Sequence, residues 1–112
     1  MERKVLCGAN AAVMKYYFND EFAAIPAAVR EELRTICVVF AAQTFGTVTL
    51  EFDEEGELFI RTGPAEDPFA YDEIGAGLKA KELRMQNREL FEALELFYKV
   101  FILKEPAGPK PD

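Results

Sequence analysis

The last third of the chain, residues 72–103, constrains the fold most, because its apolar residues recur at the spacing of one long amphipathic helix. Six positions step alternately by four and three residues: Leu83, Asn87, Leu90, Leu94, Phe97 and Phe101. This spacing is that of a coiled-coil seam, in which one buried asparagine can select the register and the oligomeric state. The pattern predicts a homodimer with its candidate interface at Leu83, Asn87, Leu90 and Leu94.

A second stripe on the same helix indicates a different environment. Phe91, Tyr98 and Ile102 widen the apolar face well beyond a narrow coiled-coil seam. A wide apolar face is typical of a helix that lies on its own sheet. The two interpretations are compatible, because the C-terminal half can pack on the sheet while the flank near Asn87 meets a partner.

Residues 47–62 show the strict alternation of a β-hairpin, with apolar and polar residues taking turns on both sides of a tight turn. The apolar positions are Val48, Leu50, Phe52, Leu58 and Ile60. The turn at residues 53–56 suits a type I conformation with Gly56 in the left-handed region. It predicts the register of the hairpin, with Phe52 opposite Leu58, Leu50 opposite Ile60, and Thr49 opposite Arg61.

The first half of the chain predicts two strands and one helix. Residues 3–18 have the period-two pattern of β structure, with a hairpin that turns at Gly8–Asn10. Pro26 suits the first turn of a helix, where its missing N–H leaves no bond unmade. Apolar residues then follow at helical spacing, so this helix should run from about Pro26 to about Ala42 and stop near Gly46.

The order of elements is therefore strand, strand, helix, strand, strand, helix, or ββαββα. This order predicts an α+β fold: a small, mostly antiparallel sheet, two helices packed on one face, and a long C-terminal helix. Residues 1–105 should form a single domain, and residues 106–112, rich in proline, should form a flexible tail. Residues 63–68 hold two prolines and an acidic pair and predict a loop before the last helix.

Composition disfavours several classes of function. The net charge of −7 argues against nucleic acid and anionic membrane surfaces, both of which attract lysine and arginine. The chain has no histidine, which removes the commonest general base and most zinc sites, so we expect no metal and no cofactor. Two cysteines do not make a secreted disulfide framework, and Cys37 lies in an apolar run that predicts a buried free thiol. These features favour a cytoplasmic protein.

Residues 71–81 form the most unusual local sequence and the candidate site for a ligand or partner. Two glycines at the start of a helix can expose backbone N–H groups to an anion, and two lysines follow closely. The candidate residues are Tyr71, Asp72, Glu73, Gly75, Gly77, Lys79 and Lys81. One alternative is a tight turn in which a glycine permits close backbone packing. Another is an enzyme that uses Asp72 and Glu73 with Tyr71 or Lys79.

Four sequence strings carry a resemblance to a known family. They are KVLCGAN at residues 4–10, LEFDEEG at 50–56, YDEIG at 71–75 and LFEALELFY at 90–98. Through them nearly the whole chain resembles a family of short, acidic, uncharacterised proteins of anaerobic Firmicutes, classed as a domain of unknown function. The resemblance implies a bacterial cytoplasmic setting and no known activity, substrate or catalytic residue.

No motif in the sequence assembles catalytic groups, so we expect a non-enzymatic, cytoplasmic protein-interaction module of unknown function. Its expected partners are a second copy of the chain and another protein, with no role for nucleic acid or membrane. The alternative is a small-ligand or anion-binding module centred on residues 71–81.

Overall fold

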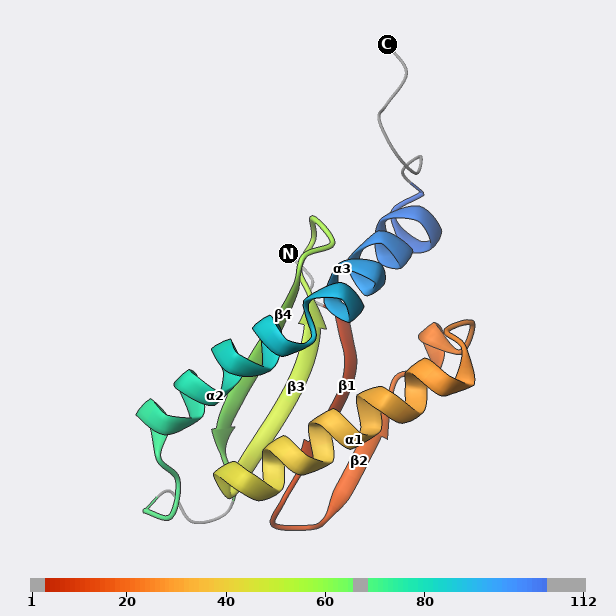
Figure 1. The fold of residues 1–112 in the computed structure, drawn as a ribbon. Coiled ribbons are helices and arrows are strands. Elements are labelled where there is room, and N and C mark those ends of the chain that lie inside the picture. The colour runs from red at the N-terminus through yellow and green to blue at the C-terminus, as the bar shows by residue number, and fades with distance from the viewer. Residues whose placement is uncertain (1–3, 66–68, 105–112) are drawn as a thin grey trace.

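The protein is built on a sheet of four antiparallel strands, and all its α-helices lie on one face of that sheet (Figure 1). The computed structural model describes residues 4–65 and 69–104. In chain order the elements are β1 (Lys4–Asn10), β2 (Lys15–Phe18), a 3₁₀ turn (Asp20–Phe22), α1 (Ala27–Thr44), β3 (Gly46–Phe52), β4 (Leu58–Pro64), α2 (Glu73–Gln86), α3 (Arg88–Phe97) and a π-helical turn (Tyr98–Ile102). The α+β class and the antiparallel sheet are as predicted. The predicted tail at 106–112 and residues 66–68 of the predicted loop lie outside the described residues.

The strand order β2-β1-β3-β4 places β1 between its hairpin partner and β3. β1 is antiparallel to both neighbours, so β2 and β3 run in the same direction on either side of it. Strands that run in the same direction need a long crossover connection. Here α1 supplies it and packs over β1 and β3.

The β3–β4 hairpin has the register that its alternation predicts. Phe52 pairs with Leu58, Leu50 with Ile60, and Thr49 with Arg61. Gly56 has a φ of 86°, the left-handed conformation expected of it. A carboxylate oxygen of Asp53 accepts hydrogen bonds from the backbone N–H groups of Glu55 and Glu57, which closes the turn.

The prediction of a turn at Gly8–Asn10 is wrong. Gly8 and Asn10 lie within β1, and the chain turns instead at residues 11–14. Gly8 serves close packing, because a Cβ there would stand 2.8 Å from the carbonyl oxygen of Val48 on the adjacent strand. Met14 closes the turn with a φ of 50°, so the period-two pattern of β2 begins only after it.

Helix α1 is two residues longer at its C-terminus than predicted and begins directly after Pro26. One stripe of the helix faces the sheet and is buried: Leu33, Cys37, Phe40, Ala41 and Thr44. The helix ends at Phe45, which has a φ of 55°. This left-handed position is usually taken by glycine, and here the glycine comes one residue later.

The prediction of one long C-terminal helix is also wrong, because the helix breaks at Asn87. Asn87 has φ −115° and ψ 29°, and its side-chain amide donates to the carbonyl oxygen of Leu83 at 3.0 Å. Asparagine favours such breaks because its side chain competes for backbone hydrogen bonds. Helices α2 and α3 therefore present separate faces, and no continuous seam runs through Asn87.

The stripe that widens the apolar face of the C-terminal helix packs on the protein's own sheet, as its width predicts. Phe91 of α3 and Tyr98 of the π-helical turn are buried. Tyr98 stacks on Phe52 of β3 with a distance of 4.3 Å between ring centroids and an interplanar angle of 17°. Phe22 lies beside both rings, at 5.6 Å from Phe52. This aromatic cluster fixes the π-helical turn to the sheet and to the 3₁₀ turn.

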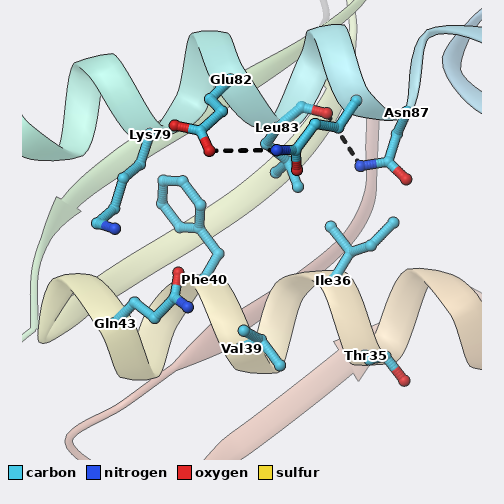
Figure 2. A pocket seen from close by; sticks show the side chains of 10 residues that line it. Thr35, Ile36, Val39, Phe40, Gln43, Lys79, Glu82, Leu83 and Asn87 are labelled. Carbon is cyan, nitrogen blue, oxygen red and sulfur yellow. Dashed lines mark hydrogen bonds between the residues drawn. The ribbon is translucent and has the colours of Figure 1, made fainter.

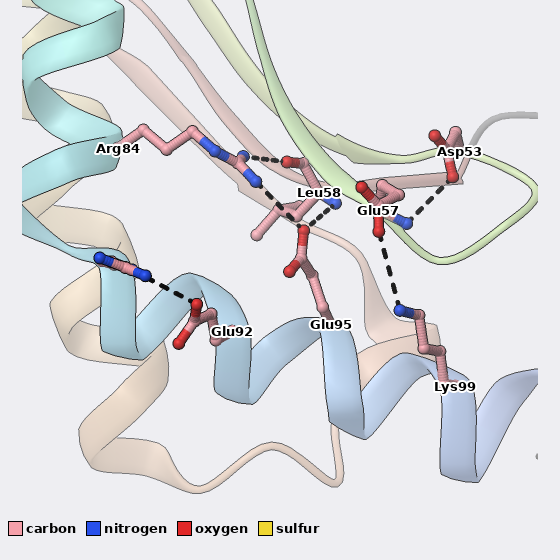
Figure 3. Close-up of polar contacts among 8 residues, drawn as sticks. Asp53, Glu57, Leu58, Arg84, Glu92, Glu95 and Lys99 are labelled. Atoms are coloured by element: carbon pink, nitrogen blue, oxygen red, sulfur yellow. Dashed lines mark hydrogen bonds and ion pairs between the residues drawn. The ribbon is translucent and has the colours of Figure 1, made fainter. Parts of the chain in front are cut away.

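A polar clamp holds the two C-terminal helices to the start of β4 (Figure 3). Glu95 of α3 accepts a hydrogen bond from the backbone N–H of Leu58 at 2.8 Å. Arg84 of α2 donates to the carbonyl oxygen of Leu58 and lies 3.3 Å from the Glu95 carboxylate. Lys99 and Glu57 add an ion pair at 3.7 Å. Both backbone groups of Leu58 are thus bonded to charged side chains.

The two cysteines meet in the core between β1 and α1. Their sulfur atoms lie 3.7 Å apart, and both side chains are fully buried as free thiols. Burial of Cys37 as a free thiol is as predicted. Its hydrogen bond with Cys7, together with burial, raises the pKa of the Cys37 thiol above its usual range.

Glu95→Ala should lower the free energy of unfolding by about 1–3 kcal/mol, because it leaves the buried N–H of Leu58 without an acceptor. Urea denaturation measures the change. The matched control is Glu92→Ala, whose ion pair with Arg88 is exposed and should contribute at most about 0.5 kcal/mol. Equal losses in the two variants would contradict the role of the clamp.

Stability should fall as the pH rises above about 9, the ordinary pKa of a thiol. The folded state holds the pKa of Cys37 above that value, so the unfolded state ionises first and becomes favoured. Burial also raises the pKa of Tyr16 and Tyr98, which extends the loss above about pH 10. Urea unfolding at a series of alkaline pH values measures the decline. Cys37→Ala should decline less steeply, and an unchanged slope would contradict the assignment.

Candidate functional site

A groove runs between α1 and α2 on the outer side of the helical layer (Figure 2). Its volume is about 380 Å³, within the range of small-molecule sites. Helix α1 contributes Thr35, Ile36, Val39, Phe40 and Gln43, and α2 contributes Lys79, Glu82, Leu83, Gln86 and Asn87. Helix α1 buries its main apolar stripe against the sheet, whereas the one buried residue of α2 is Ala76, so the two helices do not close against each other.

The groove has an apolar floor and a polar rim. The buried ring of Phe40 and the half-buried Leu83 form the floor. Figure 2 shows Lys79 and Gln43 at one end, and Ile36 and Asn87 at the other. The arrangement can enclose an apolar group and offers polar contacts around it.

Three of the six polar side chains on the rim have a hydrogen-bond partner among the described residues: Glu82, Gln86 and Asn87. The side-chain amide of Gln86 donates to Glu82 at 3.2 Å, and that of Asn87 donates to the Leu83 carbonyl oxygen. Within the described part of the chain, Lys79 forms no ion pair, so its ammonium group is available to a ligand. The groove lining contains no pair of a nucleophile and a base.

The residues of the predicted ligand site do not meet in one place. The Tyr71 hydroxyl bonds to the Thr62 hydroxyl of β4 at 2.9 Å. Asp72 caps α2, and its carboxylate accepts from the Gly75 N–H at 3.1 Å. The protein's own carboxylate therefore occupies the N-terminus of α2, where an external anion would bind.

The two lysines of that predicted site lie on different sides of α2. Lys79 lines the groove toward α1, whereas Lys81 lies over β4 beside Phe59 and Ile60. Glu73 is exposed in the first turn, and a Cβ at Gly77 would meet open space. These positions do not form the converging set of groups that an enzyme needs.

The predicted dimer residues are divided between groove and core. Leu83 and Asn87 line the groove, and Leu90 packs partly buried against the core. Leu94 is only 4% exposed and faces the protein's own sheet layer. Leu94 is thus already used within one copy of the chain.

The sequence interpretation missed a different apolar stripe, which lies on the outward face of α2. Ile74, Leu78 and Met85 are 79%, 62% and 78% exposed. With Lys81 they follow the spacing i, i+4, i+7, i+11, which places them along one face of a helix. The helical spacing of this stripe is visible in the sequence. The apolar face of the helix was instead assigned to the stripe that contains Leu83 and Leu90.

The acidic residues around the β3–β4 turn separate into two groups. Asp53 and Glu57 are tied into the turn and the clamp. Glu51 is buried on the face of the sheet away from the helices, where Thr49 donates to it at 2.7 Å and Arg61 lies at 3.4 Å. Among residues 4–65 and 69–104, no three acidic or sulfur-bearing side chains gather as a metal site.

The fold defines a small α+β protein with a groove between α1 and α2 on its helical layer. Residues 3–106 match the model of the family of unknown function DUF6145, and the chain belongs to this family. No curated protein and no solved structure matches the chain. None of the described helices has the length and apolarity required to cross a bilayer.

Asp72→Ala should destabilise the protein by about 0.5–2 kcal/mol, because it removes the cap of α2. The control is Glu73→Ala, which removes an exposed charge from the same turn and keeps the cap, so its loss should be about 0.3–1 kcal/mol. Thermal and urea unfolding measure both. If Asp72→Ala lost no more than Glu73→Ala, the cap hydrogen bond would not contribute.

Proposed function

We propose that the protein is a non-enzymatic interaction module that forms a homodimer through the outward face of α2. The observation that carries the proposal is the exposed stripe of Ile74, Leu78 and Met85. Large apolar side chains gathered on one surface are typical of protein–protein contacts.

The spacing of the stripe suits a second copy of the same helix. The steps of four, three and four residues from Ile74 to Met85 are those of a helix that packs on another helix. Lys81 lies within the stripe, and its aliphatic stem can cover apolar surface while the ammonium group stays in water. Two identical stripes related by a two-fold axis bury each other, as an isologous interface requires.

The charge of this helix opposes self-association less than the net charge of the whole chain does. The chain carries a net charge of −7, so two copies repel each other overall. Between Glu73 and Gln86, however, three basic residues outnumber two acidic ones. The contact through α2 therefore does not bring together the excess negative charge of the two chains.

Two further features belong to the proposal. We place the protein in a bacterial cytoplasm, and the buried pair of free thiols at Cys7 and Cys37 is consistent with a reducing compartment. The alternative function, an anion site at residues 71–81, has less support because Asp72 fills the N-terminus of α2.

Sedimentation equilibrium over a wide range of protein concentrations tests the dimer. The wild type should approach twice the chain mass of 12.6 kDa. Leu78→Glu should raise the dissociation constant by about tenfold or more, because it places two carboxylates in the apolar contact. The matched control, Leu96→Glu, alters a leucine of α3 that is 52% exposed and lies off the stripe, and it should leave the dissociation constant unchanged.

A wild type that remains monomeric at every concentration and at low ionic strength would overturn the proposal. If Leu78→Glu and Leu96→Glu changed the dissociation constant equally, the dimer contact would not lie on the outward face of α2. Circular dichroism of each variant verifies that the helices remain folded.

A further inference from the structure

A second cleft lies on the other flank of α1, between that helix and the β1–β2 hairpin. Its volume is about 380 Å³. The walls are mainly small apolar side chains: Ala9 and Ala11 from the hairpin, and Val38, Ala41 and Ala42 from α1. Alanines that face each other across two elements leave space that larger side chains would fill.

One polar group beside this cleft, the Tyr16 hydroxyl, has only a weak contact with the Cys7 thiol. The hydroxyl of Tyr16, which lines the cleft, is buried and forms no hydrogen bond of normal geometry. Buried polar groups nearly always have partners, so a hydroxyl with only this weak contact requires an explanation. Burial, with a contribution from Cys7, raises the pKa of the Tyr16 phenol, so the hydroxyl remains a neutral donor.

Two large apolar residues stand at the lips of the cleft in strained conformations. Met14 and Phe45 both line it, with φ values of 50° and 55°. They are 91% and 65% exposed. A left-handed conformation is strained for a residue with a side chain, and such strain gathers at ligand sites. Here the left-handed conformations hold the apolar side chains of Met14 and Phe45 exposed to water beside the cleft.

The charges at the cleft are positive although the protein is acidic. Lys15 and Arg34 both line it, one from the hairpin and one from α1. In the described residues neither forms an ion pair with a carboxylate. Two cations without an ion pair beside an apolar cleft, in a chain of net charge −7, create a local positive potential that attracts an anionic group.

We infer that this cleft binds a small amphiphilic carboxylate, with its hydrocarbon part between the alanines of β1 and α1 and its carboxylate at Arg34 and Lys15. The cleft volume lies within the range of about 300–1,000 Å³ of small-molecule sites. The hydrocarbon part removes apolar surface from water, including the lips at Met14 and Phe45. The carboxylate gains charge-assisted hydrogen bonds from the guanidinium group.

Thermal unfolding and calorimetric titration of the full chain with sodium octanoate test the site. Octanoate should raise the unfolding temperature with saturation, whereas butanoate, which is too short, and octylammonium, which has the wrong charge, should not. Absence of stabilisation by octanoate, or an equal effect of octylammonium, would overturn the proposal.

Two pairs of variants locate the binding. Ala42→Leu fills the cleft from an exposed position of α1 and should abolish octanoate binding, whereas Gln43→Leu adds bulk on the other flank and should not. Arg34→Gln should weaken binding by about tenfold, and Lys79→Gln, in the groove between α1 and α2, should leave it unchanged. Binding that survives Ala42→Leu, or that responds equally to Arg34→Gln and Lys79→Gln, would contradict the site.

Discussion

The hydrogen bonds at Leu58 are the interaction on which the arrangement of the C-terminal half depends. Glu95 of α3 and Arg84 of α2 reach the same backbone unit from opposite sides of the break at Asn87. Each helix thereby obtains its own fixed point on β4. Because the two helices are held separately, α3 can turn Phe91 and Leu94 into the core while α2 leaves Ile74, Leu78 and Met85 facing water. Charged partners make these bonds stronger than ordinary backbone pairs.

The two cavities follow from the way α1 is placed. The helix lies over the two central strands and directs one stripe into the core. Its flanks then face α2 on one side and the β1–β2 hairpin on the other, and neither neighbour closes against it. The groove toward α2 has the paired Gln86 and Asn87 beside Lys79, whereas the cleft toward the hairpin has two cations that form no ion pair among the described residues. The same helix thus borders two hollows with different linings.

The sequence was most informative where a local rule and a tertiary requirement agreed. In the β3–β4 hairpin, the alternation and Gly56 fixed both the turn and the pairing of Phe52 with Leu58. The sequence led to wrong predictions where one residue type is compatible with two different structures. Gly8 marks close strand packing and not a turn, and Asn87 breaks a helix and not a coiled-coil seam. The cavities were beyond sequence reasoning, because they depend on which flanks of α1 remain uncovered.

The position of β1 in the sheet has a consequence for how the chain is made. β1 pairs with β2 through a short turn, but its other neighbour, β3, follows only after the whole of α1. During synthesis the N-terminal hairpin therefore leaves the ribosome with an unpaired inner edge, and it must keep that edge until β3 emerges. Closing so distant a contact is slow compared with forming a hairpin. An open inner edge is also a place where nascent chains pair wrongly with each other.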